Sequence, residues 1–224
     1  MRTLTKELQD NITPEIAFNL LRDGNQRFVS NLKINRNLLQ QVNETKDGQH
    51  PFAVVLSCID SRTSAELIFD QGLGDIFSVR IAGNVLNEDI LGSMEFACHV
   101  AGAKIVLVLG HTRCGAVKGA CDHVELGHLT GLLHKIKPAI EQTPYVNGTK
   151  YAFADAVAVT NVNLVMDEIA ERSPILRQMV EDEQIAIVGG MYNVETGVVE
   201  FYEHPTISPK HSIEWPLRQE SVLS

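Results

Sequence analysis

The chain has 224 residues, enough for one α/β domain whose core needs no disulfide bond. Its 28 acidic residues outnumber its 19 basic residues, and the formal charge of −9 argues against binding to nucleic acid or to an anionic membrane surface, since both are densely negative. The hydrophobic content of 44% is ordinary for a globular protein, and the longest apolar runs are too short to span a bilayer.

The N-terminal segment, residues 1–50, differs from the rest of the chain and predicts a helical arm. Thr13 and Pro14 are a typical N-cap and first helical position, and apolar side chains recur at a helical spacing as far as Phe28. The polar stretch 31–49 is expected to be extended or looped. No apolar stretch typical of a secretory signal is seen, so we expect a soluble, cytoplasmic protein.

From residue 51 onward, short apolar runs alternate with helical patterns, which predicts a single α/β catalytic domain over residues 51–224. The apolar runs indicate strands buried on both faces, as in a parallel sheet. The expected strands are 52–56, 76–81, 105–109 and 185–188, followed by a short hairpin strand at 198–202. The expected helices are 64–71, 90–101, 129–141 and 153–171. The expected fold class is therefore α/β: a mostly parallel central sheet flanked by helices, with an N-terminal helical arm.

Two polar segments, 57–62 and 110–115, directly follow two of the expected strands. Ligands bind at the carboxyl ends of the strands in open α/β sheets, so both segments lie where a site is expected. If the two strands are close in the sheet, their side chains converge. The first segment carries Cys58, Asp60 and Arg62, and the second carries His111 and Cys114.

Together these segments offer two thiolates, one imidazole and one carboxylate, a set that suits a tetrahedral zinc ion: Cys58, Asp60, His111 and Cys114. Asp60 is the unusual member, because purely structural zinc sites mostly use cysteine and histidine. Arg62 can hold Asp60 in a bidentate salt bridge. We therefore expect Asp60 to leave zinc for Arg62 and to open the fourth position to water, whose pKa zinc lowers to about 7. The resulting zinc-bound hydroxide would attack a small electrophilic carbon, oriented by Asp60 and Arg62.

These motifs resemble those of the β-class carbonic anhydrases. The resemblance covers residues 14–203, and it is specific because paired motifs occur in order, each after an expected strand. It consists of Cys58-x-Asp60-x-Arg62, then Phe77-x-Val79-Arg80-x-Ala82-Gly83-Asn84, then His111-x-x-Cys114.

The resemblance implies an enzyme, a zinc lyase of the carbonate dehydratase type, that interconverts carbon dioxide and bicarbonate. It implies one zinc ion per chain on Cys58, His111 and Cys114, with Asp60 as a reversible fourth ligand. The implied substrate-binding residues are Gln49, which donates a hydrogen bond, and Phe77, Ala82 and Phe96, which line the carbon dioxide pocket. Gly110 and Gly115 are expected to allow close backbone approach, and Gly115 is grouped with the substrate-binding residues.

The resemblance also bears on assembly and regulation. It implies a homodimer or homotetramer in which the arm of residues 1–50 lies over the partner. One subgroup of the family has a second, inhibitory bicarbonate site that uses a tryptophan three residues before the first zinc cysteine. Val55 stands at that position, so no regulatory site of that kind is expected.

Two other functions stay open from the sequence. A hydrolase acting on carbon disulfide or carbonyl sulfide would share the same zinc site, although the Asp60–Arg62 pair together with Gln49 favours carbon dioxide. A non-catalytic zinc module that binds a partner would need a closed site without an exchangeable ligand.

The remaining thiols are expected to have no role in catalysis. Cys98 falls inside an expected helix, where free cysteine commonly packs as a small apolar residue. Cys121, His123 and His128 fit no single helical face, so a second metal site is not expected there.

Overall fold

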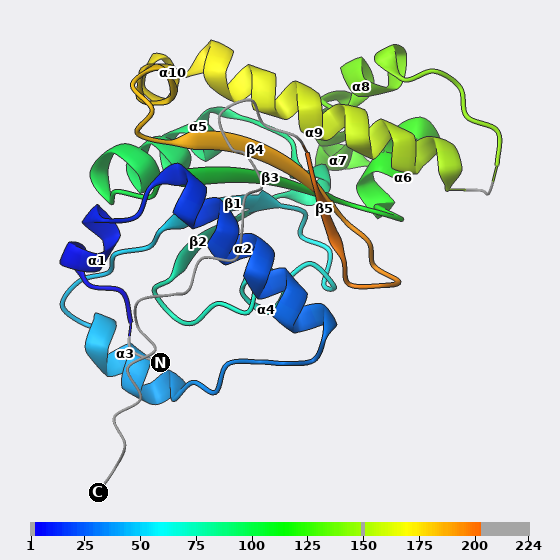
Figure 1. Ribbon diagram of the computed structural model, residues 1–224. Coiled ribbons are helices and arrows are strands. Elements are labelled where there is room, and N and C mark those ends of the chain that lie inside the picture. The colour runs from blue at the N-terminus through cyan, green and yellow to red at the C-terminus, as the bar shows by residue number, and fades with distance from the viewer. Residues whose placement is uncertain (1–2, 149–150, 203–224) are drawn as a thin grey trace, which may run out of the picture.

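Five strands form one sheet at the centre of the molecule, in the order β2-β1-β3-β4-β5 (Figure 1). The computed structural model describes residues 3–148 and 151–202. The strands are β1 (Ala53–Ser57), β2 (Ile76–Arg80), β3 (Ile105–His111), β4 (Ala186–Tyr192) and β5 (Val199–Phe201). The first four are parallel to their neighbours, and β5 is antiparallel to β4. The predicted α/β fold with a mostly parallel sheet is confirmed.

The three central strands are buried along their whole length, which explains their continuous apolar sequences. Every residue of β1, β3 and β4 is buried, because helices cover both faces of the sheet. β1 and β3 are adjacent and in register from Ala53 opposite Ile105 to Ser57 opposite Leu109. The residues that follow these paired ends therefore emerge side by side at one edge of the sheet.

One face of the sheet carries most of the helices (Figure 1). They are α5 (Glu88–Glu95), α6 (Gly115–Cys121), α7 (Gly127–His134), α8 (Lys137–Gln142), α9 (Ala152–Arg172) and α10 (Pro174–Glu181). The longest, α9, packs against β3 and β4. Gly110 on β3 allows this approach, since a Cβ there would lie 2.7 Å from Val162 Cγ2 of α9.

The opposite face is covered by the N-terminal segment and by α4 (Ala65–Ile68). α1 (Lys6–Asp10) precedes α2 (Pro14–Val29), which begins as predicted, with the Thr13 hydroxyl accepting the Ile16 N–H. Phe18 and Leu21 of α2 are buried in the same core as the β1 and β3 side chains. The N-terminal segment thus completes the core of its own chain, and its contact with a partner stays a prediction.

Several helices differ from the expectation. The stretch 31–49 was expected to lack a helix, but it contains α3 (Leu38–Thr45), capped by the Asn37 side chain. The single helix expected at 129–141 is two, α7 and α8. Pro138 in the first turn of α8 explains the break, since proline lacks the N–H that would continue the preceding helix. The helix expected at 90–101 begins at Glu88 and continues from α5 into a π-helical segment, Phe96–Val100.

None of the helices within residues 3–148 and 151–202 combines the length and the apolar character needed to cross a bilayer. The predicted domain 51–224 extends past the described residues at its C-terminal end.

Candidate metal centre

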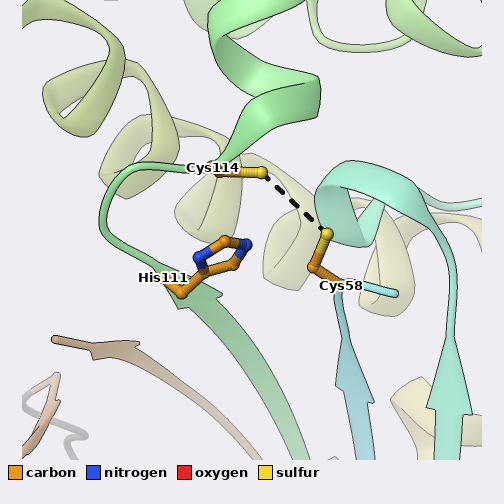
Figure 2. Close-up of side chains that lie close together, drawn as sticks. All are labelled: Cys58, His111 and Cys114. Carbon is orange, nitrogen blue, oxygen red and sulfur yellow. Dashed lines mark hydrogen bonds between the residues drawn. The ribbon is translucent and has the colours of Figure 1, made fainter. Parts of the chain in front are cut away.

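Three side chains from the ends of β1 and β3 meet at one edge of the sheet (Figure 2). Cys58 directly follows β1, His111 is the last residue of β3, and Cys114 is the N-cap of α6. Because β1 and β3 are parallel neighbours, residues 56 positions apart in the chain come together. The predicted convergence of the two segments is confirmed for these three residues.

The three side chains of the cluster lie close together and are buried. The ligand atoms of Cys58, His111 and Cys114 all lie within 4.8 Å of one another, and the two sulfur atoms are 4.0 Å apart. The three residues are 3%, 1% and 2% exposed. Cys121, His123 and His128 form no second cluster of this kind within the described part of the chain.

The imidazole of His111 is oriented by its neighbour's backbone. Its Nδ1 lies 2.9 Å from the carbonyl oxygen of Thr112. A carbonyl only accepts, so Nδ1 carries the proton and the neutral ring keeps a lone pair on Nε2. Nε2 is buried and has no hydrogen-bond partner. A buried polar nitrogen with a free lone pair beside two thiols fits a metal ion, and this carbonyl contact is the usual support for a histidine ligand.

The two thiols give a second test of that fit. The Cys114 thiol, against the opposing effect of burial and together with the nearby His111 side chain and the Gly83 N–H, lowers the pKa of Cys58 to about 4. The neighbouring Cys58 sulfur, followed by burial, raises the pKa of Cys114 above the ordinary thiol range. Two buried thiolates in contact repel each other, and a divalent cation removes that conflict. Two thiolates and one imidazole are a donor set that zinc prefers.

Asp60 lies outside the cluster, where Arg62 holds its carboxylate. Arg62 donates from Nε to Oδ1 at 2.9 Å, from NH2 to Oδ2 at 2.8 Å, and from its backbone N–H to Oδ1 at 2.9 Å. This bidentate bridge lowers the pKa of Asp60 to about 2. Asp60 is therefore ionised at neutral pH and accepts hydrogen bonds only.

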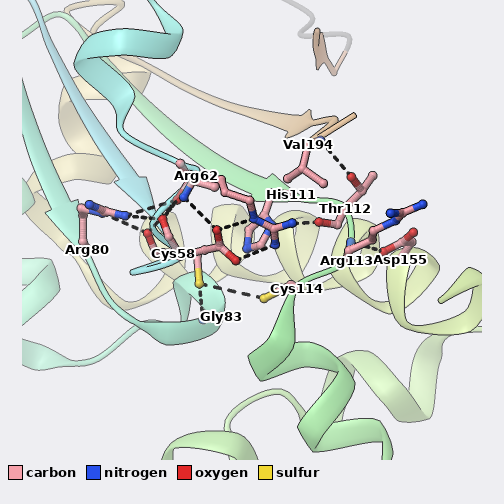
Figure 3. Close-up of polar contacts among 12 residues, drawn as sticks. Cys58, Arg62, Arg80, Gly83, His111, Thr112, Arg113, Cys114, Asp155 and Val194 are labelled. Atoms are coloured by element: carbon pink, nitrogen blue, oxygen red, sulfur yellow. Dashed lines mark hydrogen bonds and ion pairs between the residues drawn. The ribbon is translucent and has the colours of Figure 1, made fainter. Parts of the chain in front are cut away.

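The side chains of Arg80 and Thr63 hold the backbone of the loop between β1 and α4, and Figure 3 shows Arg80 beside this loop. Arg80 at the end of β2 donates from Nε to the Cys58 carbonyl at 3.0 Å and from NH2 to the Asp60 carbonyl at 2.6 Å. The Thr63 hydroxyl also lies within 3.0 Å of both carbonyls, at 3.0 Å and 2.9 Å. These contacts fix the backbone that carries Cys58 and Asp60. Arg80 stood in the quoted motif, but no pattern in the sequence indicated this role.

The loop between β3 and α6 is pinned at two points (Figure 3). The Thr112 hydroxyl accepts the Val194 N–H at 3.1 Å. Arg113 adopts a left-handed φ of 56°, and its N–H donates to Asp155 of α9 at 2.7 Å. A left-handed arginine is uncommon, so the neighbouring elements hold this conformation.

The expected substrate-binding residues divide into two groups. Ala82 and Gly115 are chain neighbours of the site: Ala82 precedes Gly83, whose N–H donates to Cys58 Sγ at 3.3 Å, and Gly115 follows Cys114. A Cβ at Gly115 would meet no atom within 4 Å, so no close packing requires glycine there.

The second group lies toward the other end of β1. Gln49 is exposed and precedes β1, whereas Cys58 follows it, and about 13 Å of extended chain separates the two ends of the strand. Phe77 pairs with Val54 near the start of β1, and its ring contacts that of Phe96, with centroids 6.1 Å apart. The structure therefore does not bring these three residues to the cluster of their own chain.

Comparison with known proteins points to one family. The family model described as carbonic anhydrase matches residues 53–199, more than half of the chain. A carbonic anhydrase of Mycolicibacterium smegmatis is 36% identical over 202 residues, covering 87% of this chain and 96% of that protein.

Solved structures agree with the fold. The β-carbonic anhydrase CafA of Aspergillus fumigatus superposes with a TM-score of 0.66 at 22% identity, over 74% of this chain and 81% of that one. A structure described as a tetrameric β-carbonic anhydrase from Sordaria macrospora gives 0.64 at 20% identity, over 70% and 82%. The sequence match, the fold and the cysteine–histidine–cysteine cluster lead to the same conclusion, that this chain belongs to the β-class carbonic anhydrase family.

Proposed function

We propose that Cys58, His111 and Cys114 hold one zinc ion per chain, and that the protein uses it to catalyse the reversible hydration of carbon dioxide to bicarbonate and a proton. The observation that carries this proposal is the buried cluster itself. It presents two thiols and a histidine nitrogen with no other partner, all within 4.8 Å. Three protein ligands leave a fourth position for water, which is the pattern of catalytic rather than structural zinc sites.

The chemistry that a zinc ion would supply here is the same as in other catalytic zinc sites. Bound zinc is a Lewis acid that lowers the pKa of water to about 7, so that hydroxide forms near neutral pH. Asp60 supplies the matching acceptor: it is ionised, and its side chain is 18% exposed. It accepts a hydrogen bond from the reacting water and fixes the orientation of the water's lone pair.

Arg62 keeps Asp60 available for that role. Its two side-chain hydrogen bonds occupy both carboxylate oxygens of Asp60, which restrains the carboxylate from binding the metal as a fourth ligand. The pair favours an exchangeable site over the closed site of a non-catalytic zinc module. Reversible ligation by Asp60 then depends on breaking this bridge.

In our proposal, the substrate at each metal centre is bound by three residues of a second copy of the chain: Gln49, Phe77 and Phe96. Phe77 and Phe96 line a hollow of about 700 Å³ at the edge of the sheet, and no metal ligand lines it. β2 forms that edge and pairs on its other side with no strand among the described residues. An open edge beside the exposed ring of Phe96 is a surface that a partner can cover. Ala82 and Gly115 would border the metal centre of their own chain.

We expect the assembly to contain an even number of chains, a homodimer or a homotetramer, with the arm of residues 1–50 contributing to the contact. The cytoplasmic location stays a prediction. It agrees with the four cysteines, all of which are free thiols, the state that a reducing compartment maintains.

Stopped-flow hydration of carbon dioxide tests the proposal. We expect a rate that rises with pH across about 6.5 to 9, the range that brackets the ionisation of zinc-bound water. The rate should vanish when a chelator removes zinc and return when zinc is added. Zinc bound in full without hydration at any pH would contradict the proposal. Turnover of carbonyl sulfide or carbon disulfide under those conditions would assign the site to a sulfur substrate instead.

A further inference from the structure

Asn161 is the polar member of an otherwise apolar helix face. It lies in the middle of α9, is 3% exposed, and occupies the stripe that packs on the sheet. The other buried residues of this helix are Ala154, Val157, Ala158, Val162, Val165 and Ile169. An amide in such surroundings is costly unless its polar atoms are paired, so its partner indicates why the residue is there.

The partner of Asn161 is the backbone of Gly83. Its Nδ2 donates to the Gly83 carbonyl at 3.0 Å. The N–H of the same glycine donates to Cys58 Sγ at 3.3 Å. Gly83 has a left-handed helical backbone, with φ 68° and ψ 16°, in which the N–H and the carbonyl of one residue point in opposite directions. Gly83 is therefore held between the helix on one side and the sulfur on the other.

Gly83 cannot anchor itself in this position. Its φ suits glycine, and a Cβ would lie 2.8 Å from Ile136 Cδ1 and 3.5 Å from Ala116 Cβ. With no side chain of its own, Gly83 depends on backbone contacts for its orientation. The Asn161 amide supplies a contact from a long, well-packed helix, and a rigid support of this kind is what a metal ligand's hydrogen-bond donor requires.

We propose that Asn161 is a positioning residue for Cys58: its amide orients Gly83 so that the Gly83 N–H donates to the sulfur that binds the metal. The inference rests on the proposed zinc site and deepens it. A hydrogen bond to a thiolate draws electron density away from the sulfur, so the sulfur donates less to the metal and its lone pairs are held in a fixed direction.

The test compares substitutions at two positions of the same helix. Asn161→Leu keeps the branched shape of the side chain and removes the amide, and Asn161→Ala removes the amide with a smaller side chain. Asn163→Leu and Asn163→Ala are the matched controls, because Asn163 is exposed and its amide bonds only within its own helix, to the Val159 carbonyl at 3.3 Å. All four variants and the wild type are loaded with cobalt(II) in place of zinc, and zinc affinity is measured by competition with a chromophoric chelator.

In both Asn161 variants we expect the sulfur-to-cobalt charge-transfer band to move to lower energy, because the thiolate loses its hydrogen bond and becomes a stronger donor. Zinc affinity should nevertheless fall about 10-fold or more, because the loss of the fixed orientation of the sulfur outweighs its stronger donation. The Asn163 variants should match the wild type in both measurements. A folded Asn161→Leu protein with the wild-type spectrum and the wild-type zinc affinity would overturn the inference.

The experiment also separates a failure of the proposed zinc site from a failure of the role proposed for Asn161. A wild-type protein that binds neither cobalt nor zinc contradicts the proposed function, not only the role of Asn161. If neither Asn161 variant folds, the wild-type protein is loaded with cadmium-113 and examined by NMR. A scalar coupling between the metal and the Gly83 amide proton through the sulfur supports the Gly83 contact on which the inference depends, and its absence refutes the inference.

Discussion

Each residue of the metal cluster has a different neighbour that prepares it for a metal ion. His111 is oriented by the Thr112 carbonyl, Cys58 accepts the Gly83 N–H, and Cys114 stands at the N-terminus of α6. These backbone contacts restrain the three residues, so little side-chain freedom would be lost if the cluster bound a metal ion.

The two buried cysteines Cys58 and Cys98 provide a matched test of the ligand set. They are 3% and 2% exposed, but only Cys58 belongs to the cluster. We expect Cys58→Ser to purify with less than one tenth of the wild-type zinc content and Cys98→Ser to retain all of it. Metal analysis of the dialysed proteins decides. Equal zinc content in the two variants would contradict the assignment of Cys58.

Arg62→Ala tests the bridge to Asp60. Without the guanidinium, the Asp60 carboxylate loses both side-chain hydrogen bonds and is free to bind the metal in place of water. We expect the hydration rate to fall about 10- to 100-fold with zinc content unchanged, as for other residues that support a metal site. Stopped-flow assays measure the rate. Arg22→Ala is the control, since Arg22 pairs with Asp23 on α2; a full rate in Arg62→Ala would rule out the restraining role.

At the level of elements, the sequence predicted best where burial is continuous. The apolar runs of β1, β3 and β4 could be recognised because strands covered on both faces have no polar positions. The short helices α1, α3, α6 and α10 were missed because five to eight residues are too few for a clear helical period. The start of α2 was predicted because Thr13 and Pro14 are a local signal.

The cluster of two cysteines and a histidine could also be predicted from the sequence, but the residues that hold its loops in place could not. Cys58, His111 and Cys114 follow strands that neighbour each other, so local sequence and one pairing assumption sufficed. Asn161 and Arg80 act through tertiary contacts that no local pattern encodes. The one available signal for Asn161 was its position, as an asparagine inside the apolar stripe of a helix.

A buried group of charges joins three segments of the chain on the opposite face of the sheet: α2, the loop before α3 and the loop after α4. Asp70, which is 5% exposed, receives hydrogen bonds from Arg27 of α2 and from Arg36, each at 2.6 Å. Burial raises the pKa of Asp70, but the bonds from the two arginines outweigh burial and hold the pKa below its ordinary value. The ionised carboxylate therefore stabilises the packing of the N-terminal segment.

Asp70→Asn should lower the free energy of unfolding by about 3 kcal/mol at pH 7, because it leaves the buried end of Arg36 without its counter-charge. The folded-state pKa is depressed, so the contribution is present above the unfolded-state pKa of about 3.9 and is lost as the pH falls through the folded-state pKa. Urea unfolding between pH 7 and pH 3 should show the two proteins converging at the acid end. Asp23→Asn, in a more exposed pair, should change little; a pH-independent gap would refute the ionic explanation.

At the scale of the whole molecule, the open edge of the sheet at β2 bears on how chains associate. β2 carries Phe77, and the Phe96 ring beside it is 52% exposed. Apolar surface next to an unpaired strand favours association with another chain. The size of the assembly and the completeness of the substrate site are therefore linked in our proposal.

Phe96→Asp tests this link. A charge at this edge should oppose association, so we expect the oligomer to dissociate into smaller species with activity reduced in proportion. Analytical ultracentrifugation combined with the hydration assay measures both. Leu126→Asp, at a residue that is 67% exposed and precedes α7, is the control. If the Phe96→Asp protein keeps the wild-type mass, the β2 edge is not the contact.

The arrangement of the two ligand loops has a consequence for the order in which a newly made chain matures. All three residues of the cluster have been synthesised once Cys114 is complete, but three of the contacts that hold their loops come from later residues: Asp155, Asn161 and Val194. At about 5–20 residues per second, the ribosome needs roughly 4 to 16 s to reach the last of these. During that interval the thiols are present without these later contacts, so we expect the nascent chain to be more open to oxidation than the folded protein.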